Sequence, residues 1–187
     1  ARTGVNAVVL GPAMGRDAAT VRRLCGDAAC DVLSLYAGAQ PQDGSVVVLV
    51  GAGSDDDAAV EVATRIWLAG TDPGGASPAP LCLVAESPGE RGRARRLADR
   101  LQALAVADVS LDEPAGGAPL VVSGWPLEGG LPDRSRFGGG PRALVHSGED
   151  PQRIGIDQRL LRLDLARRAR QSLVTSDVGG GASGGDQ

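Results

Sequence analysis

The sequence predicts an α/β fold: a mostly parallel open sheet with helices on both faces. Two observations lead to this fold class. The short apolar runs are continuous rather than alternating, as in VVVLV at 46–50, and continuous runs are typical of parallel strands buried on both faces. Amphipathic segments with helical spacing separate these runs along the chain, and such alternation is typical of α/β proteins.

The elements follow from these patterns in chain order. Strands are expected to begin near residues 6, 46, 81, 119 and 142, each at the start of an apolar run. Helices are expected at 16–30, 56–70, 88–106 and 150–173, where apolar residues recur with helical spacing. We expect one domain over residues 1–175, and a disordered tail over 176–187 because that segment is rich in glycine and poor in apolar residues.

Charge and apolar-run length indicate which partners to exclude. The net charge of −4 argues against a nucleic-acid-binding face, which is normally basic, and the arginine-rich segment 91–100 is interpreted as a solvated helix face. No apolar run reaches the roughly 18 residues of a membrane span, and the first residues lack a signal-peptide pattern. We therefore expect a cytoplasmic protein with no membrane or nucleic-acid partner.

The three cysteines are expected to be reduced and structural. Cys25, Cys30 and Cys82 are odd in number and have no CxxC spacing, so the sequence favours neither a disulfide framework nor a zinc site.

The turn GAGSDDD, after the apolar run at 46–50, is the first candidate site. A dinucleotide fingerprint would need a third glycine where Asp56 stands, and a phosphate-binding P-loop would need a lysine, which the chain lacks. Asp55, Asp56 and Asp57 are well placed to cap the following helix and to oppose its dipole. A site for a hard cation or for the edge of a tetrapyrrole stays as the alternative.

His146 is the second candidate. It is the one histidine of the chain and follows the fifth expected strand, beside Glu149 and Asp150. In open α/β sheets ligands bind outside the carboxyl ends of the strands, and imidazole titrates near neutral pH. The alternative is an incidental loop histidine.

Together these stretches resemble the tetrapyrrole chelatases that insert cobalt or iron into sirohydrochlorin, in particular the second, histidine-poor repeat of that family. VVLGPAMG is similar to the strand and turn that close the first repeat, and VVVLVGAGSDDDAAVEVATRIWLAG to the strand, loop and helix that follow. LCLVAESPGERGRARRLADRL and PLVVSGWPLEGGLPDRSR are similar to the next two strand and turn segments. The resemblance covers about residues 5–175 and implies a chelatase-like fold.

The departures from the family concern its metal ligands. Ala52 stands where an active repeat has a metal-binding histidine, and Gly129 or Gly130 stands where the second is expected. Leu83 replaces a glutamate, which leaves Glu86 as the nearest carboxylate. Imidazole is a strong ligand for Co²⁺ and Fe²⁺, so the resemblance implies a chelatase that is weak when isolated.

The resemblance implies a protein of siroheme or cobalamin biosynthesis, a lyase if it is active. Its substrates would be a tetrapyrrole and a divalent metal, Co²⁺, Fe²⁺ or Ni²⁺, and its protein partner a second copy or a complementary chelatase chain. The residues expected to act are His146 and Glu86 in catalysis, with His146 also binding metal, and, in substrate binding, Gly51, Gly53, Ser54, Asp55, Trp125, Gly129 and Gly130.

Two other interpretations stay open. One is a non-catalytic α/β domain that acts through protein contacts and has kept the fold without the site. The other is an enzyme similar to the ATP- or ADP-dependent NAD(P)HX dehydratases, because LGPAMGRDAA is similar to one of their turns.

Overall fold

A seven-stranded sheet forms the centre of the fold. The structure is a computed structural model, and it describes residues 7–11, 18–28, 30–36, 38, 44–70, 79–85, 87–114, 117–125, 137, 139–148 and 154–178. Across the sheet the strands lie in the order β1 (Ala7–Leu10), β2 (Asp31–Tyr36), β7 (Arg142–His146), β6 (Leu120–Gly124), β3 (Val46–Val50), β4 (Leu81–Ala85) and β5 (Val109–Ser110). This arrangement is the α/β fold that the sequence predicts.

Five neighbouring strands, β7, β6, β3, β4 and β5, are parallel, which confirms the mostly parallel sheet. β2 is antiparallel to β7, with Val32 opposite His146, and β1 is parallel to β2. The first predicted strand is therefore present, but it lies at one end of the sheet and runs against the central strands. Because β7 and β2 run in opposite directions, Asp31 at the start of β2 reaches the edge where β7 ends.

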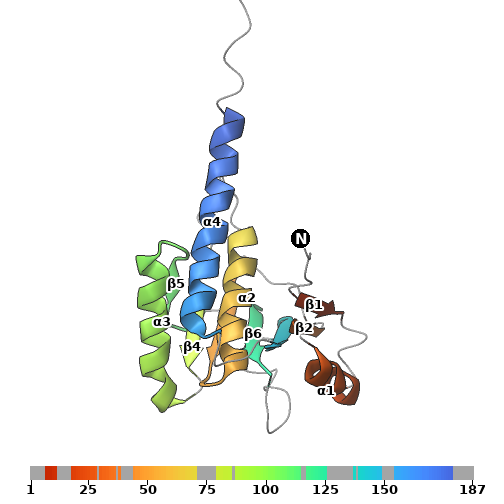
Figure 1. The fold of residues 1–187 in the computed structure, drawn as a ribbon. Coiled ribbons are helices and arrows are strands. Elements are labelled where there is room, and N and C mark those ends of the chain that lie inside the picture. Colours follow the sequence, from red (N-terminus) through yellow and green to blue (C-terminus); the bar gives the residue numbers. More distant parts are fainter. Residues whose placement is uncertain are drawn as a thin grey trace, which may run out of the picture.

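Three helices cover one face of the sheet: α2 (Ser54–Gly70), α3 (Arg91–Ala103) and α4 (Ile156–Val178) (Figure 1). Alternate residues of the strands point toward them, among them Val48, Leu83 and Val145, all at most 1% exposed. They pack against Ala63 of α2 and Leu163 of α4. Burying a side chain of this size stabilises the fold by about 1.5–3 kcal/mol, so this cluster fixes the helices on the sheet.

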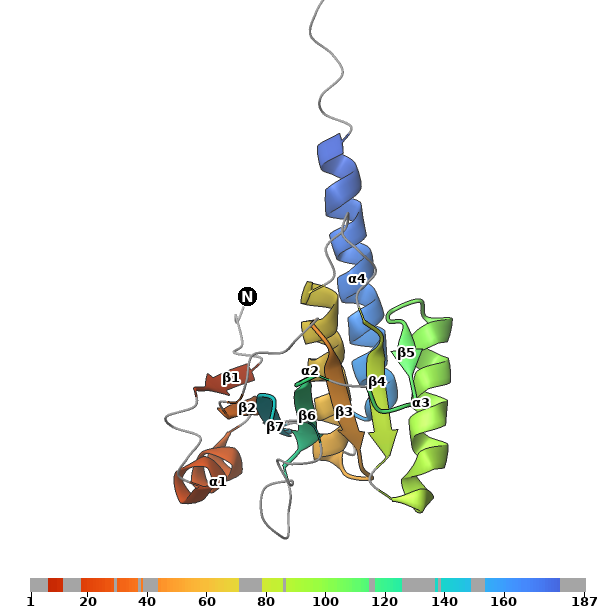
Figure 2. The same ribbon diagram turned by 180° about the vertical axis from the view of Figure 1, so that it is seen from behind.

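The other face carries α1 (Ala18–Asp27), which lies beside β1 and β2 in Figure 2. Val21 and Cys25 of this helix pack against Leu10 and Val32. Over the central strands a further cluster of the described residues joins Val47, Leu49, Cys82, Val84 and Val121 to Phe137. Helices thus lie on both faces, as predicted, with one face far more completely covered by the described helices.

α4 continues past the predicted end of the domain. It runs to Val178, so a division after residue 175 falls inside the helix, and 179–187 lie outside the described residues. In both views the end of α4 extends beyond the sheet (Figures 1 and 2). None of the helices in the described ranges combines the length and the apolar character needed to cross a bilayer.

Candidate functional site

Two glycines let the amino end of α2 approach the carboxyl ends of β3 and β6. A Cβ on Gly51 would lie 2.5 Å from Oδ2 of Asp56, and one on Gly124 would lie 2.7 Å from the Asp56 amide nitrogen. Gly51 does not adopt positive φ, so its backbone conformation is not what requires a glycine there. The physical reason is close approach: the Asp56 carboxylate occupies the space that a side chain would need.

The three aspartates of this turn have three different roles. Asp56 accepts a hydrogen bond from the Gly53 amide at 2.7 Å, Asp57 forms an ion pair with Arg93 of α3, and Asp55 turns toward β7. Of the three predicted caps, therefore, only Asp56 binds a backbone amide at the start of α2. Asp57 instead fixes α3 against α2, because an ion pair joins the two helices.

Burial affects the titration of two of these carboxyls. It raises the pKa of Asp56 above the ordinary value of 3.8, although the Gly53 amide and the charge of Arg93 act in the opposite direction. Burial also raises the pKa of Asp57, again against the opposing effect of Arg93. Both carboxylates therefore carry a desolvation cost when they are ionised.

Asp55 and His146 form the most prominent polar pair at the strand ends. Nδ1 of His146, the last residue of β7, lies 3.2 Å from Oδ2 of Asp55, and the other oxygen accepts the Ser147 amide at 2.8 Å. In the tautomer with the proton on Nδ1, the ring donates to Asp55 and Nε2 keeps its lone pair. The His146 side chain is 25% exposed, so the pair lies at the boundary between protein and solvent.

A buried arginine binds Ser147, the residue next to His146. Arg159, in the first turn of α4, is 1% exposed and donates from Nη1 to Asp31 at 3.0 Å and to Glu61 at 2.8 Å. Its Nη2 donates to the Ser147 hydroxyl at 2.7 Å. Burial would lower the pKa of Arg159, but the hydrogen bonds and charges of Asp31 and Glu61 outweigh it and raise the pKa, so the side chain is a permanent cation.

The segment after β7 is held at three points as a result. Asp55 binds the Ser147 amide, Arg159 binds the Ser147 hydroxyl, and Asp31 accepts the Gly148 amide at 3.2 Å. These contacts come from α2, α4 and β2, which lie far apart in the sequence. The orientation of His146 is therefore set by a rigid framework and not by its own loop.

The other residues predicted for the site divide into two groups. Gly51 and Trp125 follow the ends of β3 and β6, Gly53 lies in the turn, and Ser54 is the first residue of α2, so all four share the edge with Asp55 and His146. The half-buried Trp125 packs against the α1 cluster and donates its amide to the Val145 carbonyl at 2.8 Å. Glu86, Gly129 and Gly130 lie outside the described residues, as do the neighbours of His146 considered above, Glu149 and Asp150.

Ligands for a metal are few in this part of the protein. Across the described ranges, no group of three or more His, Cys, Asp or Glu side chains is arranged to hold a metal ion, so the Asp55–His146 pair could supply two ligands at most. All three cysteines are free. Burial, and then the charge of Asp55, raises the pKa of Cys25 to about 11, so this thiol is protonated at neutral pH and is neither a nucleophile nor a metal ligand there.

Sequence reasoning missed the Arg159 network. One signal could have indicated it: Arg159 falls on the same helical stripe as Ile156, Leu160 and Leu163, and an arginine on an apolar stripe requires buried partners. No comparable signal marked Asp31, because β2 follows directly on the predicted helix at 16–30 and was not recognised as a strand.

Comparison with known proteins gives no assignment: no family model, no curated protein and no solved structure matches this chain.

Proposed function

We propose that the protein is a chelatase-like protein of tetrapyrrole metabolism in the cytoplasm, with His146 and Asp55 as the pair that directs the metal. The observation that carries the proposal is the 3.2 Å contact between His146 Nδ1 and Asp55 Oδ2 at the carboxyl edge of the parallel strands. Ligands of open α/β sheets bind at this edge. The resemblance of the glycine-rich turns to the chelatase family points to a tetrapyrrole as the ligand.

The pair supplies one of the two groups that metal insertion requires. Insertion needs one group that directs the divalent metal and one base that accepts the protons of the pyrrole nitrogens. With Nδ1 bound to Asp55, Nε2 is the nitrogen for the metal substrate, and the carboxylate behind the imidazole fixes the orientation of the ring. The two pyrrole protons would pass to Glu86 or to water. The remaining ligands would come from water and from the tetrapyrrole itself, because the described residues supply two at most.

The tetrapyrrole would lie over the strand ends. The Asp56 carboxylate fills the space beside Gly51 and Gly53, so the tetrapyrrole would lie on the outer side of this turn, and Trp125 contributes an aromatic ring after β6. Glu86, Gly129 and Gly130 remain part of the proposal as sequence neighbours of these strand ends. Without the two histidines of active family members, turnover of the isolated chain is expected to stay below about 1 per second, the low end of ordinary enzymes.

The test is a titration of the purified chain with sirohydrochlorin and Co²⁺ or Ni²⁺, followed by absorbance. Wild-type protein is expected to bind the tetrapyrrole and to accelerate insertion weakly over the protein-free rate. His146→Ala should abolish the acceleration, and Asp55→Asn and Glu86→Gln should reduce it. Asp99→Asn changes an exposed carboxylate on α3 and serves as the matched control that should keep wild-type behaviour.

Four outcomes would contradict the proposal. Rapid insertion that is insensitive to His146→Ala would mean that the site lies elsewhere. Insertion that Asp99→Asn reduces as much as His146→Ala would mean that charge alone matters. No spectral change with either substrate would favour the non-catalytic interaction domain, whereas dehydration of a hydrated nicotinamide nucleotide with ATP or ADP would favour the dehydratase interpretation.

A further inference from the structure

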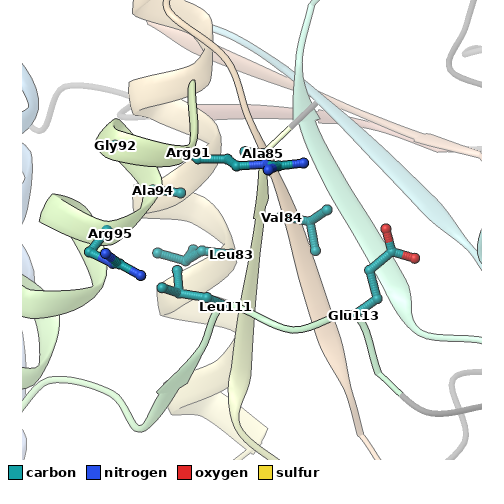
Figure 3. A pocket seen from close by; sticks show the side chains of 9 residues that line it. All are labelled: Leu83, Val84, Ala85, Arg91, Gly92, Ala94, Arg95, Leu111 and Glu113. Atoms are coloured by element: carbon teal, nitrogen blue, oxygen red, sulfur yellow. The ribbon is translucent and has the colours of Figure 1, made fainter. Parts of the chain in front are cut away.

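An open pocket of about 490 Å³ lies at the other end of the same edge, between β4 and α3 (Figure 3). It exists because β5 is only two residues long and pairs with Leu81 and Cys82 alone, so the last residues of β4 pair with β3 on one side and have no described strand on the other. The chain that follows β5, at Leu111 and Glu113, forms the opposite wall.

The floor of the pocket is apolar. Leu83 and Val84 of β4 and Ala94 of α3 contribute to the lining and are buried. Leu111 contributes as well and remains 41% exposed, so an apolar ligand in the pocket would cover it. The volume falls within the range of about 300–1,000 Å³ of small-molecule pockets.

The charged groups of the lining are two arginines and one glutamate. Arg91 and Arg95, one helical turn apart, both come from α3; Arg95 stays on the α3 side, the Arg91 side chain extends across the end of β4 beside Ala85, and Glu113 lies beyond β4 (Figure 3). On the same helix Arg93 pairs with Asp57 and Arg100 with Asp157. In contrast, neither Arg91 nor Arg95 makes a hydrogen bond or an ion pair with a described residue. Two guanidinium groups thus line the pocket without an ion pair to a described residue, and the Glu113 carboxylate lines the same pocket.

We propose that this pocket binds a monovalent organic anion with an apolar body. Guanidinium groups bind planar oxyanions in a bidentate manner, while the apolar body would cover Leu83, Ala94 and Leu111. The other wall, formed by Leu111 and Glu113, supplies no cation among the described lining residues, so a ligand with a single anionic end fits the pocket best. The proposal does not depend on the Asp55–His146 pair, because it rests on other residues.

The probe is 8-anilinonaphthalene-1-sulfonate, a monovalent anion with an aromatic body, whose fluorescence rises on transfer to an apolar pocket. Wild-type protein is expected to bind it in a one-to-one ratio, and octanoate should displace it. Octanedioate, which has the same chain length and a second carboxylate, should displace it about tenfold less well, the difference that about 1.4 kcal/mol makes. Equal displacement by the two acids would overturn the monovalent specificity.

Substitutions of the lining residues test where the probe binds. Arg91→Gln with Arg95→Gln should weaken binding about tenfold, since charge-assisted hydrogen bonds are lost, and Leu111→Glu should weaken it similarly by adding a negative charge at an exposed position. Arg96→Gln is the matched control: Arg96 is exposed on the same helix but does not line this pocket, so binding should be unchanged.

The proposal is overturned if the double variant binds as the wild type does, or if Arg96→Gln weakens binding equally, because the arginines would then act only as a diffuse positive surface. Loss of probe binding in His146→Ala would also overturn it by placing the probe at the other end of the edge. Thermal melting of each variant confirms that a folded protein is compared, since the same dye binds loosely packed states.

Discussion

Arginines occur at both ends of the sheet edge formed by the carboxyl ends of the parallel strands, and the two groups differ in their surroundings. Arg159 is 1% exposed and binds Asp31, Glu61 and Ser147. Arg91 and Arg95 are exposed, and no described residue pairs with either. One end of the edge has its charges neutralised within the fold, and the other presents charge outward.

The difference shows which arginines the fold requires. Removing an ion from water costs several kcal/mol, so a buried guanidinium persists only with carboxylates placed around it. An exposed guanidinium carries no such cost, and an exposed ion pair adds little stability, so nothing in folding forces Arg91 or Arg95 to have a partner. We infer that Arg159 serves the structure and that the α3 pair is free to serve binding.

The largest effect is expected from Arg159→Met. Among the described residues, Asp31 would lose its ion pair with Arg159, and Glu61 would retain its ion pair with Arg65. The Asp31 carboxylate would then be largely buried without a cation beside it. Breaking a buried pair in this way costs about 3–5 kcal/mol. Urea denaturation should show that decrease in the free energy of unfolding.

The matched control is Arg95→Met, the same change at the other end of the edge. Its free energy of unfolding should stay within about 0.5 kcal/mol of wild type, as is usual for surface positions. If the two variants are equally stable, the comparison between buried and exposed arginines is wrong. Asp31→Asn added to Arg159→Met should restore part of the lost stability, because one unpaired charge is then removed.

A second test compares two glycines. In Gly124→Ala the new Cβ would lie 2.7 Å from the Asp56 amide nitrogen and 2.9 Å from the Asp55 carbonyl carbon, so the start of α2 must move. We expect a loss of about 1–3 kcal/mol, the usual cost of overpacking. Gly92→Ala meets only the tip of Arg96 at 3.5 Å and should be neutral or stabilising by up to about 1 kcal/mol, as for alanine in a helix.

Thermal melting of both variants measures this contrast. Equal destabilisation by Gly124→Ala and Gly92→Ala would mean that the close approach of α2 to the strand ends does not constrain the packing at the Asp55–His146 end of the edge. Loss of stability in Gly124→Ala should also reduce the proposed tetrapyrrole binding, since Asp55 moves with the helix.

The central fold could be predicted from the sequence because its signals are local. Continuous valines at 46–50 and helical spacing after Asp56 identify β3 and α2 without any knowledge of distant residues. β2 was not predicted because DVLSLY is short and its burial alternates, with every second residue only half-buried. Its reversal against β7 has no sequence signal, since strand order is decided by long-range packing.

The site could be predicted only in part for a related reason. Strand ends identified the edge and His146, but the partner of His146 is Asp55, 91 residues earlier in the chain, and not the acidic residues that follow it in the sequence. The same holds for Asp31 and Arg159. Sequence patterns report periodicity along one element, whereas these contacts join four elements.

A smaller effect is expected from pH at the capping aspartate. Because burial raises the pKa of Asp56, the folded state binds this proton more tightly than the unfolded chain does. The resulting stability is present below the ordinary pKa of 3.8 and is lost as pH rises through the raised pKa. Asp56→Asn keeps an acceptor for the Gly53 amide and removes the charge, so it should gain stability relative to wild type as pH rises through that range.

Denaturation midpoints measured from acid to neutral pH check this, with Asp99→Asn on the exposed face of α3 as the control. The same advantage for Asp56→Asn at all pH values would show that the amide acts through packing and not through ionisation. A loss at neutral pH would mean that the charge of Asp56 at the helix start is more important than its desolvation.

The smallest effect, and opposite in sign to that of Arg159→Met, is expected at the α3 arginines. Like charges at i and i+4 repel, and cations at a helix start oppose its dipole, each by about 0.2–1 kcal/mol at low salt. Arg91→Gln with Arg95→Gln should therefore raise the free energy of unfolding by a few tenths of a kcal/mol in low salt and have no effect in about 1 M salt, where screening acts within 3 Å. Melting curves at the two salt concentrations measure the difference.

A variant that is more stable but binds the anionic probe less well would indicate that these arginines are kept for a ligand at some cost to the fold. A variant that is less stable in low salt would mean that the two side chains have structural partners after all, and the contrast with Arg159 would fail.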